Sequence, residues 1–156
     1  VRPSGRYPTL ETRIMDVCTR IDDAIALASM LVCILRMLYR LRLGNQRWRT
    51  YTPMLINENR WRAMRYSFDE GLIDFAKGEL VPFDQLLLDI LNMTADDAEA
   101  LGCKAEIASL HDILRCGTSA HRQLNTYQDA LAAGQSEEDA LKSVVDALIA
   151  ATAEGV

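Results

Sequence analysis

The sequence predicts a mainly α-helical domain with one strand near its start and a short hairpin. Apolar residues recur at helical spacing through most of the chain, and glycines or capping residues separate these runs. Strand-like alternation is clearest over residues 9–17. With 156 residues, 49% hydrophobic and 25% charged, the chain has the length and composition of a single globular domain with its own core.

The expected strand over residues 9–17 carries the first candidate site. At period two, Leu10 and Ile14 point to one side, whereas Glu11 and Arg13 lie on the other, about 7 Å apart by strand rise. The Pro- and Gly-rich loop before the strand adds two arginines, Arg2 and Arg6. Carboxylates suit hard cations such as Mg²⁺, and guanidinium groups suit phosphate. The pattern indicates a metal-and-phosphate site or, alternatively, a surface strand with an ion pair.

Two helices are expected after the strand. Thr19, with Asp22 three residues later, resembles a capping box that starts a long helix ending near Leu43. Its most apolar run, residues 24–35, is shorter than the ~20 residues of a spanning helix. We therefore expect a helix buried under several neighbours and not a membrane anchor. Thr52-Pro53 predicts a second helix, over residues 54–68.

The rest of the chain predicts a short hairpin or a loop over residues 72–81 and then helices alone. A Leu-rich helix spans residues 84–93, and Thr94 begins a short one that ends at Gly102. Further apolar stripes end at glycines 117 and 134, and Ser136 with Asp139 predicts the cap of the last helix. These stripes are expected to form core.

The second candidate site lies within residues 58–66 of the second helix. Asn59 and Arg62 share a face with Tyr66, and Arg65 is one turn from Trp61. Asn59, Arg62 and Arg65 could form a polar wall for a nucleotide or a carboxylate substrate. The alternative is structural: an ion pair between Glu58 and Arg62, with Arg65 stacked on Trp61.

The charge distribution and the cysteine spacing limit the kinds of site that the chain can carry. Residues 1–65 hold twelve arginines against five acids, whereas residues 66–156 hold five basic groups against seventeen acids. The arginines are spread over a strand and two apolar helices, which favours a local anion site over nucleic acid binding. The four cysteines lack metal-site spacing and predict reduced thiols in a cytoplasmic protein.

Four sequence blocks resemble those of a known family. Residues 2–16, Arg-Pro-Ser-x-x-x-Pro-Thr-Leu-Glu-x-Arg-x-x-Asp, are similar to the signature of the glutamate–cysteine ligase type 2, or carboxylate–amine ligase, family. Residues 58–66 resemble a second block, and residues 72–74 and 117–123 resemble later ones in the same order. The chain departs from the family pattern at Ser67, where Gly is common, and at His121, where an acidic residue is frequent.

The resemblance implies an ATP- and Mg²⁺-dependent ligase that forms an amide through an acyl phosphate. It implies the helical part of an α+β fold similar to that of glutamine synthetase. Carried over, Glu11 is a Mg²⁺ ligand, Arg13 is catalytic at the transferring phosphoryl group, and Arg2 binds a phosphate or anionic substrate. An amino acid and an amine are the implied substrates. The alternative is a non-catalytic helical scaffold or protein-interaction module.

A lone strand also needs a backbone partner. We therefore expect a single domain over residues 1–156 that is the C-terminal portion of a longer polypeptide. Its N-terminal sheet, or a companion chain, would pair with the strand. Homo-oligomerisation is left open.

Overall fold

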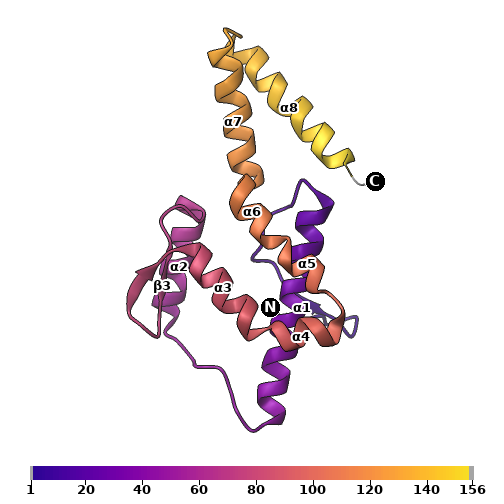
Figure 1. Cartoon of the computed structure of the whole chain (residues 1–156), viewed down its shortest axis with the longest axis vertical. Coiled ribbons are helices and arrows are strands. Elements are labelled where there is room, and N and C mark those ends of the chain that lie inside the picture. The colour runs from indigo at the N-terminus through magenta and orange to yellow at the C-terminus, as the bar shows by residue number, and fades with distance from the viewer. Residues whose placement is uncertain (1, 155–156) are drawn as a thin grey trace.

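The structure, a computed structural model, describes residues 2–154 and confirms the mainly helical class (Figure 1). Its strands form two separate two-stranded antiparallel sheets, β1–β2 and β3–β4. The elements in chain order are β1 Arg2–Pro3, β2 Leu10–Glu11, α1 Ile21–Leu43, α2 Pro53–Tyr66, β3 Leu72–Asp74, β4 Glu79–Val81, α3 Phe83–Met93, α4 Ala95–Leu101, α5 Lys104–Ala108, α6 Leu110–Cys116, α7 Ser119–Ala132 and α8 Glu137–Ala153.

The core lies between α1 and the short helices α4, α5 and α6. One stripe of α1, spaced by four, three and four residues, is buried there and consists of Ala26, Met30, Cys33 and Met37. Leu87, Ala98, Ile107 and Leu110 contribute the facing side chains. A carboxylate is enclosed beside this core, because Asp97 is fully buried and accepts hydrogen bonds from Arg36 and Arg40 of α1.

The helix α1 is less covered than its sequence predicts. Ile25 and Val32 are 45% and 48% exposed, although the apolar run led us to expect neighbours on several sides. By length and composition alone α1 is apolar enough to cross a membrane, a test that core helices of soluble proteins also pass. Within residues 2–154, the chain supplies enough helices to cover only one face.

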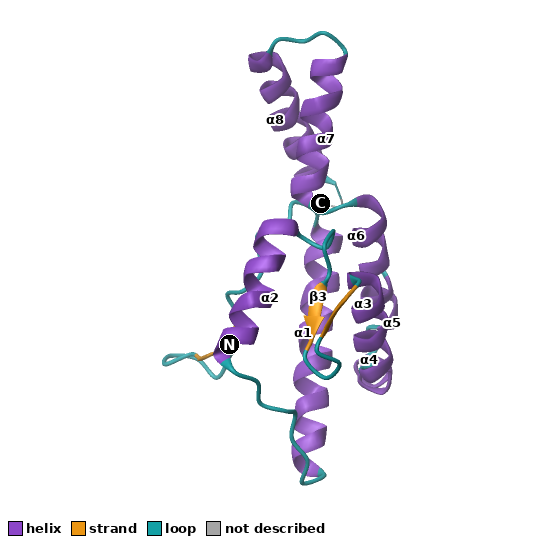
Figure 2. Ribbon diagram, turned by 90° about the vertical axis from the view of Figure 1, so that its left-hand side faces the viewer, coloured by secondary structure: helices purple, strands orange, loops and turns teal. Residues whose placement is uncertain are grey.

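The helices α7 and α8 form a hairpin that projects from the rest of the molecule (Figures 1 and 2). The two helices contact each other along their lengths and touch little else. As predicted, Ser136 caps α8, because its hydroxyl accepts a hydrogen bond from the Asp139 backbone N–H at 3.2 Å.

Two predictions about the first fifty residues are wrong. The strand covers Leu10–Glu11 instead of residues 9–17, and it pairs inside the chain with Arg2–Pro3. Within the described residues, the ladder pairs Arg2 with Glu11 and Pro3 with Leu10. The apolar side chains of the expected strand are open to solvent, with Leu10 57% and Ile14 72% exposed.

The capping box predicted at Thr19 is also absent. The helix α1 begins at Ile21, and Arg20 stands at its N-cap without a side-chain hydrogen bond. The Thr19 hydroxyl instead contacts the Ser119 hydroxyl, 100 residues later in the chain. A tertiary contact has therefore replaced the local cap.

Candidate functional site

The N-terminal hairpin brings together three of the predicted site residues, Arg2, Glu11 and Arg13. Antiparallel pairing places Arg2 directly opposite Glu11. Arg2 Nε donates to Glu11 Oε2 at 2.8 Å, and Arg13 Nε donates to Oε1 at 2.5 Å. Each carboxylate oxygen thus faces one guanidinium group. Hydrogen bonds from Arg13 and then from Arg2 lower the pKa of Glu11 and keep it ionised.

The turn between β1 and β2 is organised by Ser4. Its backbone N–H donates to the Thr9 carbonyl at 2.9 Å, and its hydroxyl accepts from the N–H groups of Arg6 and Tyr7 at 3.2 Å each. The Arg6 guanidinium lies over the Tyr7 ring, 5.3 Å from its centroid. Arg6 is thereby directed away from Glu11, so the local turn selects Arg2 and Arg13 as the carboxylate's partners.

The exposure of this cluster suits an exchangeable ligand. The side chains of Arg2 and Arg13 are 64% and 69% exposed and that of Glu11 is 37% exposed. The two guanidinium groups have further donors and fit a phosphate. The fit to Mg²⁺ is incomplete, because residues 2–154 contain no cluster of three or more ligating side chains. Glu11 can supply one ligand, and the others must come from elsewhere.

The predicted residues of α2 contact the β3–β4 hairpin. The Asn59 amide donates to the Ile73 carbonyl at 2.9 Å and accepts from the Ile73 N–H at 2.8 Å. Arg62 donates to the carbonyls of Gly71 and Glu70 at 3.2 Å each. These bonds position the hairpin against α2. The Glu58 partner suggested for Arg62 by the structural alternative is replaced by these backbone carbonyls.

The third member, Arg65, has a different aromatic partner from the one expected. Its guanidinium lies 5.7 Å from the ring centroid of Tyr66, and Trp61 packs edge-on against the same ring. Arg65 is exposed, and its side chain forms no hydrogen bond within residues 2–154. Of the three, it is the one whose side-chain donors are not used to hold the β3–β4 hairpin.

A cleft of about 520 Å³ begins directly after Arg13. The segment Ile14–Thr19 forms one wall and the C-terminal part of α2 forms another, with Arg60, Ala63 and Met64. The face of α2 that looks into the cleft therefore carries Arg60, a residue that the sequence analysis did not select. The sequence places Arg60 and Met64 on one face of the helix, because they are four residues apart. It does not indicate that this face lies opposite the N-terminal segment.

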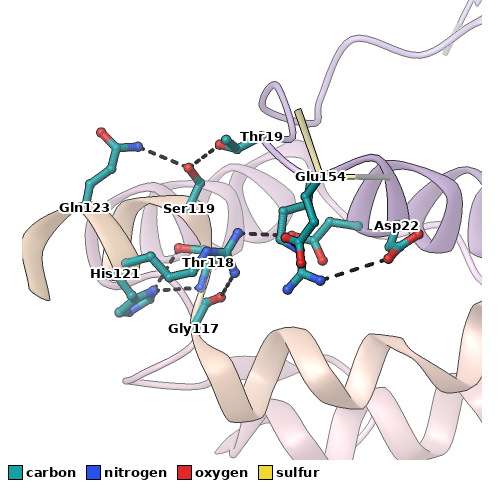
Figure 3. Close-up of polar contacts among 11 residues, drawn as sticks. Thr19, Asp22, Gly117, Thr118, Ser119, His121, Gln123 and Glu154 are labelled. Atoms are coloured by element: carbon teal, nitrogen blue, oxygen red, sulfur yellow. Dashed lines mark hydrogen bonds and ion pairs between the residues drawn. The ribbon is translucent and has the colours of Figure 1, made fainter. Parts of the chain in front are cut away.

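Another wall of the cleft comes from residues 118–120, and Leu27 of α1 and Ile113 of α6 also line it. Figure 3 shows how this loop is tied to the start of α1: Ser119 contacts Thr19 at 2.5 Å, and Gln123 donates to Ser119 at 3.1 Å. Arg122 continues the connection by donating to the Gly117 carbonyl at 2.7 Å and to Asp23 at 3.1 Å. The sequence block at residues 117–123 therefore acts by cross-linking two helix starts beside the cleft.

His121 completes this loop. Its Nδ1 lies 2.7 Å from the Thr118 hydroxyl and 3.2 Å from the Thr118 N–H, and its Nε2 faces Asp69 at 3.4 Å. Gly117 has φ +83°, and a Cβ there would lie 2.7 Å from the Cβ of His121. Glycine at 117 lets the imidazole close over the turn.

Comparison with known proteins agrees with these blocks. Residues 1–147 match the model of glutamate-cysteine ligase family 2. A protein of Rhodospirillum rubrum is 55% identical over 152 residues, covering 97% of this chain and 39% of the relative. One from Chloroflexus aurantiacus is 36% identical over 156 residues, covering all of this chain and 38% of the relative. Both carry the name "Putative glutamate--cysteine ligase 2".

The chain thus spans about two fifths of the length of these relatives. No solved structure gives a significant match to it.

Proposed function

Since the chain belongs to glutamate-cysteine ligase family 2, we propose that it forms part of an ATP-dependent ligase that joins a carboxylate to an amine, with glutamate and cysteine as the first pair to test. The observation that supports this is the Arg2–Glu11–Arg13 cluster, in which two exposed guanidinium groups flank an ionised carboxylate in the segment that leads along the chain into the cleft. This arrangement suits the binding of a polyphosphate and the stabilisation of charge on a phosphoryl group.

The proposed reaction has two steps. A carboxylate oxygen of the first substrate attacks the γ-phosphorus of ATP, the bond to the β-phosphate oxygen breaks, and ADP leaves. The amine nitrogen then attacks the acyl carbon of the acyl phosphate, phosphate leaves, and the nitrogen loses a proton to give the amide. Both steps develop negative charge on phosphate oxygens, which is where preorganised guanidinium groups are most effective.

Each residue of the cluster has a distinct role in this proposal. Arg13 is placed at the transferring phosphoryl group and Arg2 at a neighbouring phosphate or substrate anion. Glu11 holds both arginines in place and offers one oxygen ligand to Mg²⁺, which neutralises phosphate charge when bound. The other ligands come from ATP and from the part of the polypeptide outside this chain.

The helix α2 contributes in two ways. Asn59 and Arg62 are positioning residues, because their hydrogen bonds go to the backbone of the β3–β4 hairpin. Arg65 is exposed and is the member of this set that contacts the nucleotide in our proposal.

The test uses the complete polypeptide, with this chain in its natural context. ADP release is measured with glutamate and cysteine for the unmodified protein, Glu11→Gln and Arg13→Lys. We expect each substitution to reduce turnover by about 100-fold, as when one preorganised electrostatic group is removed. Arg13→Lys keeps the charge but loses the planar fork that contacts two oxygens.

Arg6→Lys is the matched control, because Arg6 lies in the same hairpin but packs on Tyr7. It should retain turnover. Unchanged turnover in both Glu11→Gln and Arg13→Lys, at unchanged melting temperature, would assign the cluster to structure alone and favour the non-catalytic scaffold.

A further inference from the structure

The helix α1 carries a second apolar stripe that the rest of the chain leaves open. The stripe repeats at spacings of four and three residues, which places its members on one face of the helix. Its members are Ile21, Ile25, Ala28, Val32, Leu35, Tyr39 and Leu43. All are exposed except Leu35, which is half-buried. At 1.5 Å per residue the stripe is about 33 Å long.

This stripe faces away from the core of the chain. The packed stripe, from Ala26 to Met37, is offset from it by roughly 150° at 100° per residue. Contacts with α4, α5 and α6 cover the packed side. Ile21 and Val32, on the open side, are 44% and 48% exposed. A continuous apolar row of this length on a solvent-exposed helix face indicates a contact surface.

The charges of α1 distinguish a protein partner from a bilayer. Arg36 and Arg40 turn toward the packed side, where both pair with Asp97. The helix α4, which packs against α1, also carries the exposed acidic side chains of Asp96 and Glu99. A bilayer around α1 would have to take in these charged groups, whereas a protein face laid on the open stripe would not. The open stripe itself contains no charged side chain.

We propose that this open stripe is the docking surface for the part of the family's polypeptide that lies outside this chain, through an apolar face of that part. The relatives are long enough to supply it, because this chain matches only 39% of the Rhodospirillum rubrum relative. The stripe begins ten residues after Glu11, at Ile21. The N-terminal end of the stripe is therefore close along the chain to the carboxylate cluster, which needs further ligands.

The experiment measures binding and not turnover, so its failure is distinguishable from failure of the proposed ligase activity. The 156-residue chain, carrying an affinity tag, is co-expressed with the untagged portion of the Rhodospirillum rubrum relative that lies outside the matching region. We compare the unmodified chain with the double variant Ile25→Gln/Val32→Gln. The expected result is a one-to-one complex with the unmodified chain and at least a tenfold lower yield of complex with the variant.

The matched control is Leu141→Gln/Val145→Gln on α8. These side chains are 58% and 54% exposed and also share one face of their helix, one turn apart, but they lie on the projecting hairpin. The control should retain the complex. Where the glutamine variant does not fold by circular dichroism, Ile25→Ala/Val32→Ala replaces it, since alanine keeps the helix and removes most of the apolar area.

Three outcomes overturn the proposal. The first is a complex that is absent with the unmodified chain or that survives both stripe variants. The second is equal loss in the α8 control. The third is a complex that is retained by the stripe variants while the same substitutions abolish self-association of the chain or its flotation with phosphatidylcholine–phosphatidylglycerol vesicles. That result would assign the surface to a second copy or to a membrane.

Discussion

Two regions of this protein each hold one carboxylate between two arginines, and they use it differently. In the N-terminal hairpin, Glu11 accepts from Arg2 and Arg13, and all three side chains are open to solvent. Beside the core, Asp97 accepts from Arg36 and Arg40, and its side chain is fully buried.

The difference between the two clusters lies in what surrounds the carboxylate. Asp97 has lost its water, and the two guanidinium groups compensate for that loss, so they cannot leave at low cost. Glu11 can exchange either arginine for water or a cation, and the arginines can exchange Glu11 for a phosphate, at little cost. The same chemistry therefore serves as a structural connection between α1 and α4 in one region and as a candidate ligand site in the other.

The largest expected effect separates the two clusters by stability. Asp97→Asn keeps the shape of the side chain but removes the charge that two arginines require, and it should lower the free energy of unfolding by about 3 kcal/mol. Denaturant unfolding measures this change. Asp96→Asn, at the exposed neighbouring position, is the control and should have a small effect. A small effect of Asp97→Asn as well would show that the buried pair is not needed.

The pH dependence of stability should also distinguish the two clusters, with the larger contribution from Asp97. Hydrogen bonds from Arg40, and next from Arg36, hold the pKa of Asp97 below its ordinary value of 3.8. A depressed carboxyl pKa stabilises the fold above the unfolded value, and this stability is lost as the pH falls through the folded value. Between pH 5 and pH 2, the melting temperature of Asp97→Asn should fall less steeply than that of the unmodified chain.

Glu11→Gln provides the contrast in that titration, because the pKa of Glu11 is also lowered but the group is exposed. Its melting curve should follow that of the unmodified chain at every pH. A divergence as large as that of Asp97→Asn would mean that the hairpin cluster is structural too.

A smaller effect is expected at the cleft, where Ser67 has φ +55° at the end of α2. This conformation favours glycine, and glycine is common there in the pattern that the chain otherwise resembles. Ser67→Gly should raise the free energy of unfolding by about 1 kcal/mol, measured by denaturant titration. Destabilisation would show that the serine side chain compensates for the backbone conformation.

The smallest effect concerns the reactivity of two thiols, one on the packed side of α1 and one at the cleft. Burial and the neighbouring Cys103 thiol raise the pKa of Cys33 to about 11. Burial also raises the pKa of Cys18, which lines the cleft. In the native chain at pH 8, iodoacetamide should modify Cys18 well before Cys33, as followed by peptide mass spectrometry. Modification of Cys33 first would indicate that the packed side of α1 opens readily.

The sequence by itself determined most of the helices. The expected helix over residues 54–68 is observed as Pro53–Tyr66, and Ser136 caps α8 as its spacing with Asp139 indicated. The mainly helical class and the hairpin at residues 72–81 are also confirmed. These features depend on contacts within a few residues, which is the range over which propensity, capping and apolar periodicity act.

Tertiary structure alone decided the surroundings of the candidate site. Period two placed Glu11 and Arg13 together, but the partner strand Arg2–Pro3 and the direction of Arg6 came from the turn at Ser4. The roles of Asn59 and Arg62 depend on a hairpin about ten residues away, and Thr19 forms its contact 100 residues along the chain. Local patterns state which residue types lie on one face, whereas the chain's path through space determines what that face meets.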